Sequence, residues 1–257
     1  MSASPTPVLF LGHGSPMNAI EDNAWRRAWR AAALDLPRPK AVLCVSAHWE
    51  TLGLAVTASP APATIHDFGG FPQALFDVQY RAPGDPALAA RVAELLAPEP
   101  VALHPTRGLD HGAWSVLMPM YPDADVPVVQ LSLDRRRTPR EHYDLAKRLA
   151  PLRDEGVLIV ASGDIVHNLR AADFRRPEAP PWADRFNEAA KDLIARGEHQ
   201  PLIDYQTLGD DALWSINSAE HYLPLLYALA LQRPEEATSF FNDDVFAAIS
   251  MTSVRIG

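Results

Sequence analysis

The sequence predicts one α/β domain over residues 1–257, with a central mostly parallel or mixed sheet flanked by helices. Short apolar runs alternate with amphipathic segments along the chain, which is typical of alternating strands and helices. No linker, low-complexity tract or internal repeat divides the sequence. Three apolar runs are each followed closely by a histidine, and ligands bind at strand ends in open α/β sheets. We therefore expect one site that gathers these histidines at the strand ends.

The bulk composition indicates a globular protein without nucleic-acid or membrane partners. Hydrophobic residues make up 47% of the chain, and the formal net charge of -9 argues against nonspecific nucleic-acid binding. No run approaches the roughly 20 apolar residues that cross a bilayer, and residues 1–7 lack the pattern of a secretory signal. Cys44 is the only cysteine and lies in an apolar run, which predicts a buried thiol and a cytoplasmic location.

The first part of the chain predicts three strands, one helix and one long loop. Residues 8–11 and 41–50 are apolar runs that read as buried strands, and 52–58 alternates weakly, which favours a third. Residues 19–34 mix tryptophan, alanine and charged side chains as an amphipathic helix does, and prolines close it. Residues 60–72 are rich in Pro, Gly and aromatic side chains, which predicts a loop that walls the substrate.

The rest of the chain continues the alternation. Further strands are predicted over 101–104, 126–133, from 157 onward, and over 237–256 as a return to the sheet. Further helices are predicted over 86–96, 115–120, 138–152, 181–196, 201–208, 210–216 and 218–231. Thr138 is expected to cap its helix with Pro139 at the first position, and Gly197 is expected to end the helix before it.

Histidine is the residue type that points most directly to chemistry. Nine are present, and those in special settings are His13, His48, His111, His167 and His221. Imidazole is the commonest metal ligand, and ligands from separate loops at strand ends converge readily. The sequence holds no HExxH, GxSxG or Walker A motif, so a zincin, an α/β-hydrolase and a P-loop NTPase have no support.

Five ordered motifs carry a resemblance to a known family. They are residues 11–19 (LGHGSPMNA), 46–49 (SAHW), 108–114 (GLDHGAW), 167–169 (HNL) and 220–225 (EHYLPL). With these motifs the chain resembles the class III, catalytic-subunit type of extradiol ring-cleavage dioxygenases, in the DOPA 4,5-dioxygenase branch. The resemblance covers nearly the whole chain. It implies a non-haem metal-dependent enzyme that opens the ring of a catechol such as DOPA with dioxygen.

The resemblance also implies roles for the histidines. His13 and His48 become metal ligands, and His221 becomes the third, with Glu220 as its rival. His111 becomes a catalytic acid/base group, and so does His167. Fe(II) is the cofactor expected for activity, and Zn(II) is plausible as the bound metal. Because zinc favours four ligands, His167 is also a candidate metal ligand.

Several neighbouring residues receive expected supporting roles. Asp110 is expected to orient His111, and Asp164, where relatives often have asparagine, to orient His167. An aromatic pocket is expected from Trp49, Phe68, Phe71, Trp114 and Tyr222. The partners are then a small aromatic diol and dioxygen, for a monomer or small homo-oligomer. The alternatives are a zinc-dependent enzyme on the same scaffold and a non-catalytic metal-binding protein.

Overall fold

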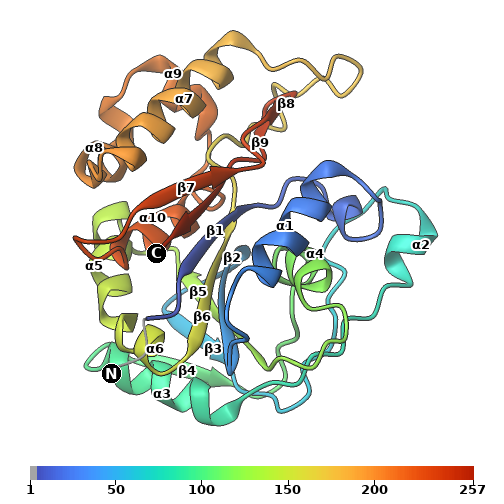
Figure 1. Ribbon diagram of the computed structural model, residues 1–257, viewed down its shortest axis with the longest axis vertical. Coiled ribbons are helices and arrows are strands. Elements are labelled where there is room, and N and C mark those ends of the chain that lie inside the picture. The colour runs from blue at the N-terminus through green and yellow to red at the C-terminus, as the bar shows by residue number, and fades with distance from the viewer. Residues whose placement is uncertain (1–4) are drawn as a thin grey trace.

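Eight strands form one mixed sheet at the centre of the molecule (Figure 1). The computed structural model describes residues 5–257. Residues 1–4, which belong to the N-terminal segment 1–7 where no secretory signal was expected, lie outside the described residues. The sheet order is β4-β3-β5-β2-β6-β1-β10-β7. The strands are β1 Val8–Gly12, β2 Ala41–Thr51, β3 Leu54–Thr57, β4 Val101–His104, β5 Val128–Asp134, β6 Val157–Gly163, β7 Thr238–Phe241 and β10 Ser253–Ile256. Strands β8 (Val245–Phe246) and β9 (Ile249–Ser250) form a separate hairpin.

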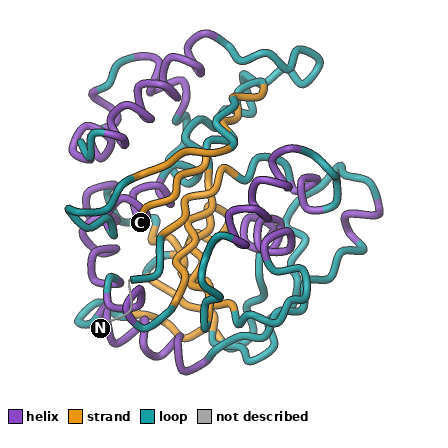
Figure 2. The backbone as a smooth tube through the Cα atoms, in the orientation of Figure 1, coloured by secondary structure: helices purple, strands orange, loops and turns teal. Residues whose placement is uncertain are grey.

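The predicted mixed sheet is confirmed. Strands β1, β6, β2 and β5 run parallel, so their carboxyl ends meet at one edge of the sheet. Strand β10 pairs antiparallel with both β1 and β7, so the C-terminal segment does return to the sheet. Strand β3 pairs antiparallel with β5 and parallel with β4. Figure 2 shows the strands as one twisted layer with helices on both sides.

The helix Pro86–Leu96 has its predicted bounds, the other predicted helices occur in the expected order with shifted bounds, and the short helix Gln73–Phe76 was not predicted. The helices are α1 Ala24–Leu34, α2 Gln73–Phe76, α3 Pro86–Leu96, α4 His111–Met120, α5 Pro139–Ala146, α6 Pro151–Asp154, α7 Pro181–Ala195, α8 His199–Ile203, α9 Asp210–Ser215 and α10 Leu223–Ala230. Short 3-10 turns cover Pro16–Ala19, Lys147–Leu149 and Tyr205–Thr207. Within residues 5–257, no helix combines the length and apolar character needed to cross a membrane.

Capping explains where the helix bounds differ from the prediction. Helix α1 begins later than expected because the Asn23 side chain accepts a hydrogen bond from Arg26 N and starts a new helix there. Helix α5 has the expected Thr138 cap, completed by Glu141 as a capping box. The predicted 138–152 helix is nevertheless broken, with a 3-10 turn before Pro151.

The alternation of side chains along the strands fills a core on each face of the sheet. In β1, Val8 and Phe10 face one cluster, and Leu9 and Leu11 face the other. The first cluster includes residues of α3, α5, α7 and α10, and the second includes residues of α1 and α4. Figure 1 shows α1 and α4 on one side of the sheet and α5 and α10 on the other. This packing fixes the strand ends that carry the histidines.

Gly163, at the end of β6, gives a testable case of this close packing. A Cβ at this position would lie 2.1 Å from the carbonyl oxygen of His221. We expect Gly163→Ala to lower the free energy of unfolding by about 1–3 kcal/mol, because backbone must shift to admit the methyl group. Gly69→Ala is the matched control, since nothing lies within 4 Å of its added Cβ. Urea denaturation of both variants checks this, and equal stability losses would contradict it.

Candidate functional site

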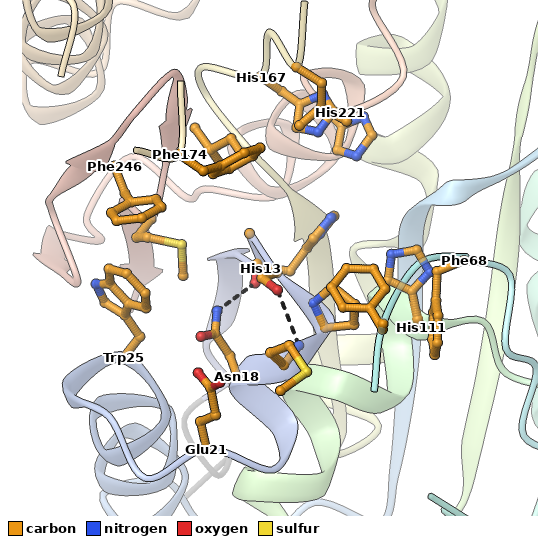
Figure 3. Close-up of a pocket in the computed structure, with 18 of the residues that line it drawn as sticks. His13, Asn18, Glu21, Trp25, Phe68, His111, His167, Phe174, His221 and Phe246 are labelled. Carbon is orange, nitrogen blue, oxygen red and sulfur yellow. Dashed lines mark hydrogen bonds between the residues drawn. The ribbon is translucent and has the colours of Figure 1, made fainter. Parts of the chain in front are cut away.

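One cavity of about 560 Å³ receives all five of the singled-out histidines. His13 follows β1, His48 lies in β2, and His111 begins α4. His167 comes after β6, and His221 precedes α10. Figure 3 shows His167 and His221 on one side of the cavity and His111 on another, with His13 between them. The structure therefore brings together every candidate site residue that the sequence analysis selected.

Local backbone features aim these side chains. The pairing of β2 with β5 shifts register between Val45 and Glu50, and His48 lies within this irregular stretch. The end of β6 ties two of the histidine segments together. Gly163 O accepts a hydrogen bond from His13 N at 3.2 Å, and Asp164 N donates to His221 O at 2.8 Å. Backbone hydrogen bonds at the carboxyl end of β6 thus fix the positions of two histidine segments that are far apart in the sequence.

The hydrogen bonds of His13 leave its Nε2 free to accept. Ser162 Oγ donates to Gly112 O at 2.6 Å, so at its 3.0 Å contact it accepts from His13 Nδ1. The proton of His13 is therefore on Nδ1, and Nε2 carries the lone pair. His48 Nε2 lies 3.1 Å from His13 Nε2. This separation is short enough for the two ring nitrogens to hold one shared ion.

Glu220 and His221 have different positions. The Nδ1 atom of His221 lies 3.1 Å from Glu220 Oε1, which leaves His221 Nε2 as the free ring nitrogen. The ring nitrogens of His13, His48 and His221 offer donor atoms that lie within 4.8 Å of one another. Glu220 is not among the residues that line the cavity. This arrangement favours His221 over Glu220 as the third ligand.

His167 stacks on His221. Their ring centroids are 3.5 Å apart and their planes differ by 7°. A metal bound to imidazole lies near the plane of the ring, so one ion cannot lie in the planes of two stacked parallel rings. A donor atom of His167 does lie within 4.8 Å of donor atoms of His221 and Asp164. In this arrangement, the stacking favours His167 as a proton-transfer group rather than a ligand beside His221.

Asp67, not Asp110, orients His111. The Oδ1 atom of Asp67 accepts from His111 N at 3.0 Å and lies 2.9 Å from His111 Nδ1. The expected role of Asp110 is wrong, because its carboxylate caps α4 and accepts from Ser46 Oγ and Gln130 Nε2. Sequence analysis missed Asp67 because nothing in the sequence shows that its loop folds back onto α4. An acidic residue within the aromatic, glycine-rich loop was the available signal.

Asp164 faces His13 and does not hydrogen-bond to His167, contrary to the expectation. Its Oδ1 accepts from Gly14 N at 3.1 Å, and its Oδ2 lies 3.6 Å from His13 Nε2. The Oδ2 atom is buried and has no hydrogen-bond partner among residues 5–257. Burial raises the pKa of Asp164 well above its usual range. A cation bound at His13 Nε2 would supply the missing partner.

Burial keeps four of the cavity histidines uncharged at neutral pH. Burial lowers the pKa of His13 and His221 well below the usual range, and neighbouring imidazoles lower it further. Burial also lowers the pKa of His48 to about 3 and of His167 to about 4. Neutral imidazole is the form that binds a metal. The donor set, with neutral imidazoles and a partnerless carboxylate oxygen, therefore fits a divalent cation.

The aromatic wall of the cavity differs from the predicted one. Phe68 and Phe71 line it as expected, but Trp49, Trp114 and Tyr222 do not. The Trp114 indole instead donates to Ile65 O at 2.8 Å, and Tyr222 packs in the core with its hydroxyl on Leu202 O. The other aromatic residues that line the cavity are Trp25, Phe174 and Phe246, from segments that sequence reasoning did not connect.

Comparisons with known proteins identify the family of the chain. A family model described as the catalytic LigB subunit of aromatic ring-opening dioxygenase matches residues 5–248. A 4,5-DOPA dioxygenase extradiol of Escherichia coli (strain K12) is 50% identical over 263 residues, covering 100% of this chain and 97% of that protein. A protein of the same name from Beta vulgaris is 39% identical over 229 residues, covering 86% of this chain and 85% of that protein. The crystal structure of an uncharacterized protein from Escherichia coli K12 aligns with a TM-score of 0.86 at 43% identity, covering 98% of this chain and 100% of that one.

Proposed function

Because the chain belongs to the LigB family of aromatic ring-opening dioxygenases, we propose that it opens the ring of a catechol such as DOPA at a divalent metal site built from its cavity histidines. The single observation that carries this proposal is the convergence of donor atoms from His13, His48 and His221 within 4.8 Å. Three nitrogen ligands leave positions open for the two hydroxyls of a catechol and for dioxygen.

The ligands in this proposal are His13, His48 and His221, and the metal for activity is Fe(II). Zinc fits the same nitrogen donors, but it undergoes no redox change. When bound, Fe(II) would supply the redox chemistry that lets dioxygen react with the ring. The protein's part is to hold the ion, to orient the catechol against Phe68 and Phe71, and to move protons.

Two further histidines move these protons. The Nε2 atom of His111 carries the lone pair, because its Nδ1 is held by Asp67, so it accepts a proton from a catechol hydroxyl. His167 stands with His221, across the cavity from His111 (Figure 3). Because burial keeps His167 uncharged, it first accepts the proton of the second catechol hydroxyl and then returns that proton during ring opening. Two groups serve the two sides of a planar ring, which one imidazole could hardly do.

The cellular setting and assembly follow the same proposal. The one cysteine, Cys44, is buried and free, and burial raises the pKa of its thiol well above the usual range. Such a thiol is unreactive and needs no oxidising compartment. A cytoplasmic enzyme, present as a monomer or small homo-oligomer, with a small aromatic diol and dioxygen as its partners, fits this composition.

The orienting role of Asp67 gives a prediction. Asp67→Asn is expected to lower kcat by about tenfold to 100-fold with the metal still bound, because it removes the carboxylate that holds the proton of His111 on Nδ1. Asp77→Asn is the control, since that exposed carboxylate contacts Gln73 and does not line the cavity. Steady-state kinetics with metal analysis checks this. Equal kcat values for Asp67→Asn and the control would contradict the role of Asp67.

A catechol panel tests the proposed function itself. The protein is loaded anaerobically with Fe(II) and offered DOPA, unsubstituted catechol and alkyl-substituted catechols under oxygen. Ring opening next to the hydroxyls gives a yellow conjugated product, which absorbance and mass measure. We expect at least one catechol to yield the product with both oxygen atoms incorporated. Release of unopened quinone, or no turnover of any catechol by metal-bearing protein, would overturn the proposal.

A further inference from the structure

The cavity lining is strongly asymmetric in charge. Apart from the histidines, Glu21 is its single ionisable side chain, and no Lys or Arg lines it within residues 5–257. The Glu21 carboxylate makes no ion pair or hydrogen bond with the described part of the chain, whereas its neighbour Asp22 is paired with Arg27 at 2.9 Å. Glu21 thus offers an unneutralised negative charge to whatever fills that part of the cavity.

The Glu21 segment is held in place by the backbone. Glu21 N donates to Met17 O at 2.9 Å, and Asn18 Nδ2 donates to His13 O at 3.2 Å. The loop that carries the first metal-ligand candidate therefore also carries Glu21. Figure 3 shows Glu21 below Asn18, on the opposite side of the cavity from His167 and His221. A substrate that reaches the metal with its ring can extend its side chain toward Glu21.

Aromatic rings line the same cavity as this carboxylate. Trp25 and Phe246 pack edge to face with centroids 5.9 Å apart, and Phe174 lies 6.3 Å from Phe246. The Trp25 indole is fixed because its Nε1 donates to Asp244 Oδ2 at 2.8 Å. An ammonium group is attracted both by a carboxylate and by the faces of such rings. A carboxylate at this place would meet a like charge and lose water without gaining a cationic partner.

We propose that Glu21, Trp25 and Phe246 form a subsite for an ammonium group. Among catechols, the site then prefers side chains that carry an ammonium group and disfavours side chains that carry a carboxylate without an ammonium group; the side chain of DOPA carries both groups. This inference rests on the proposed function for the placement of the catechol ring. It adds the chemical class of the side chain, which the ring-opening reaction itself does not specify.

The test measures binding separately from turnover. Zn(II)-loaded protein, which holds the catechol without redox chemistry, is titrated anaerobically by calorimetry with dopamine, 4-ethylcatechol and 3-(3,4-dihydroxyphenyl)propionate. We expect dopamine to bind about threefold to tenfold more tightly than 4-ethylcatechol, and the propionate to bind most weakly. An order in which the propionate binds as tightly as dopamine would overturn the subsite.

A matched pair of variants separates a local effect from the overall negative charge. Glu21→Gln is expected to reduce the ratio of dopamine to 4-ethylcatechol affinity by about threefold. Asp22→Asn removes the same formal charge from the adjacent residue, which does not line the cavity, and should leave the ratio unchanged. Equal changes in both variants would assign the preference to net charge and overturn the role of Glu21.

Turnover of 4-ethylcatechol by Fe(II)-loaded protein distinguishes failure of the ring-opening function from failure of the ammonium subsite. If 4-ethylcatechol is opened but the zinc form shows no preference for dopamine, the ammonium subsite fails and the ring-opening function stands. If the preference holds and depends on Glu21 while no catechol is opened, the ring-opening function fails and the subsite stands.

Discussion

Alanine at His13 is expected to remove about one metal equivalent per chain and, with it, all ring-opening activity. The His13 ring lies close to two other potential ligand groups, since its Nε2 lies 3.1 Å from His48 Nε2 and 3.6 Å from Asp164 Oδ2. His48→Ala is expected to have the same effect. Loss of fold should be small, because the strand that precedes His13 is packed by residues other than the ring.

Metal analysis after dialysis, with circular dichroism as the check on folding, measures this loss. His199→Ala is the matched control, because that half-buried histidine contacts Tyr143 and Gln232 and does not line the cavity. It should keep its metal. Full metal retention in both His13→Ala and His48→Ala would show that the ion is held elsewhere.

Replacement of His111 by alanine is the second large effect. We expect kcat to fall by about 10²- to 10⁴-fold while the metal stays bound, because the proposed acceptor of the catechol proton is lost. His111 is almost fully buried, and its Nδ1 is committed to Asp67, so its Nε2 is the atom available for proton transfer. His167→Ala should lower kcat in the same range through the opposite side of the ring.

His66→Gln is the control for His111. This histidine belongs to the same aromatic loop region and bonds to Val78 O, but it does not line the cavity. The kcat of the His66→Gln variant should stay within about twofold of the wild-type value. Wild-type turnover by His111→Ala across the pH range would make His111 structural and would require another base.

Most of the fold and the histidine set could be predicted from sequence because their signals are local. The run at β1 ends in His13 between two glycines, and the run at β2 contains His48, so strand ends and histidines were visible together. Helix α3 and strand β4 have the predicted bounds, since proline at the helix start and apolar periodicity mark them.

The contacts around the histidines depend on segments that meet only after folding. Asp67 reaches His111 across 44 residues of chain, whereas the adjacent Asp110 is used as a helix cap. Likewise, Trp25 and Phe246 come together from opposite ends of the chain. Sequence neighbours such as Asp110 were the natural choice, but the side-chain direction at a helix start turns them away from the histidine that follows.

Oxygen uptake shows whether these histidines hold a redox-active ion that opens a catechol ring. Protein freed of metal is loaded anaerobically with Fe(II) or with Zn(II), and oxygen consumption is recorded after a catechol is added. We expect the iron form to consume oxygen in step with the loss of catechol and the zinc form to consume none, because zinc has no redox chemistry. Equal oxygen uptake by the two forms, or no uptake by protein shown to contain iron, would contradict it.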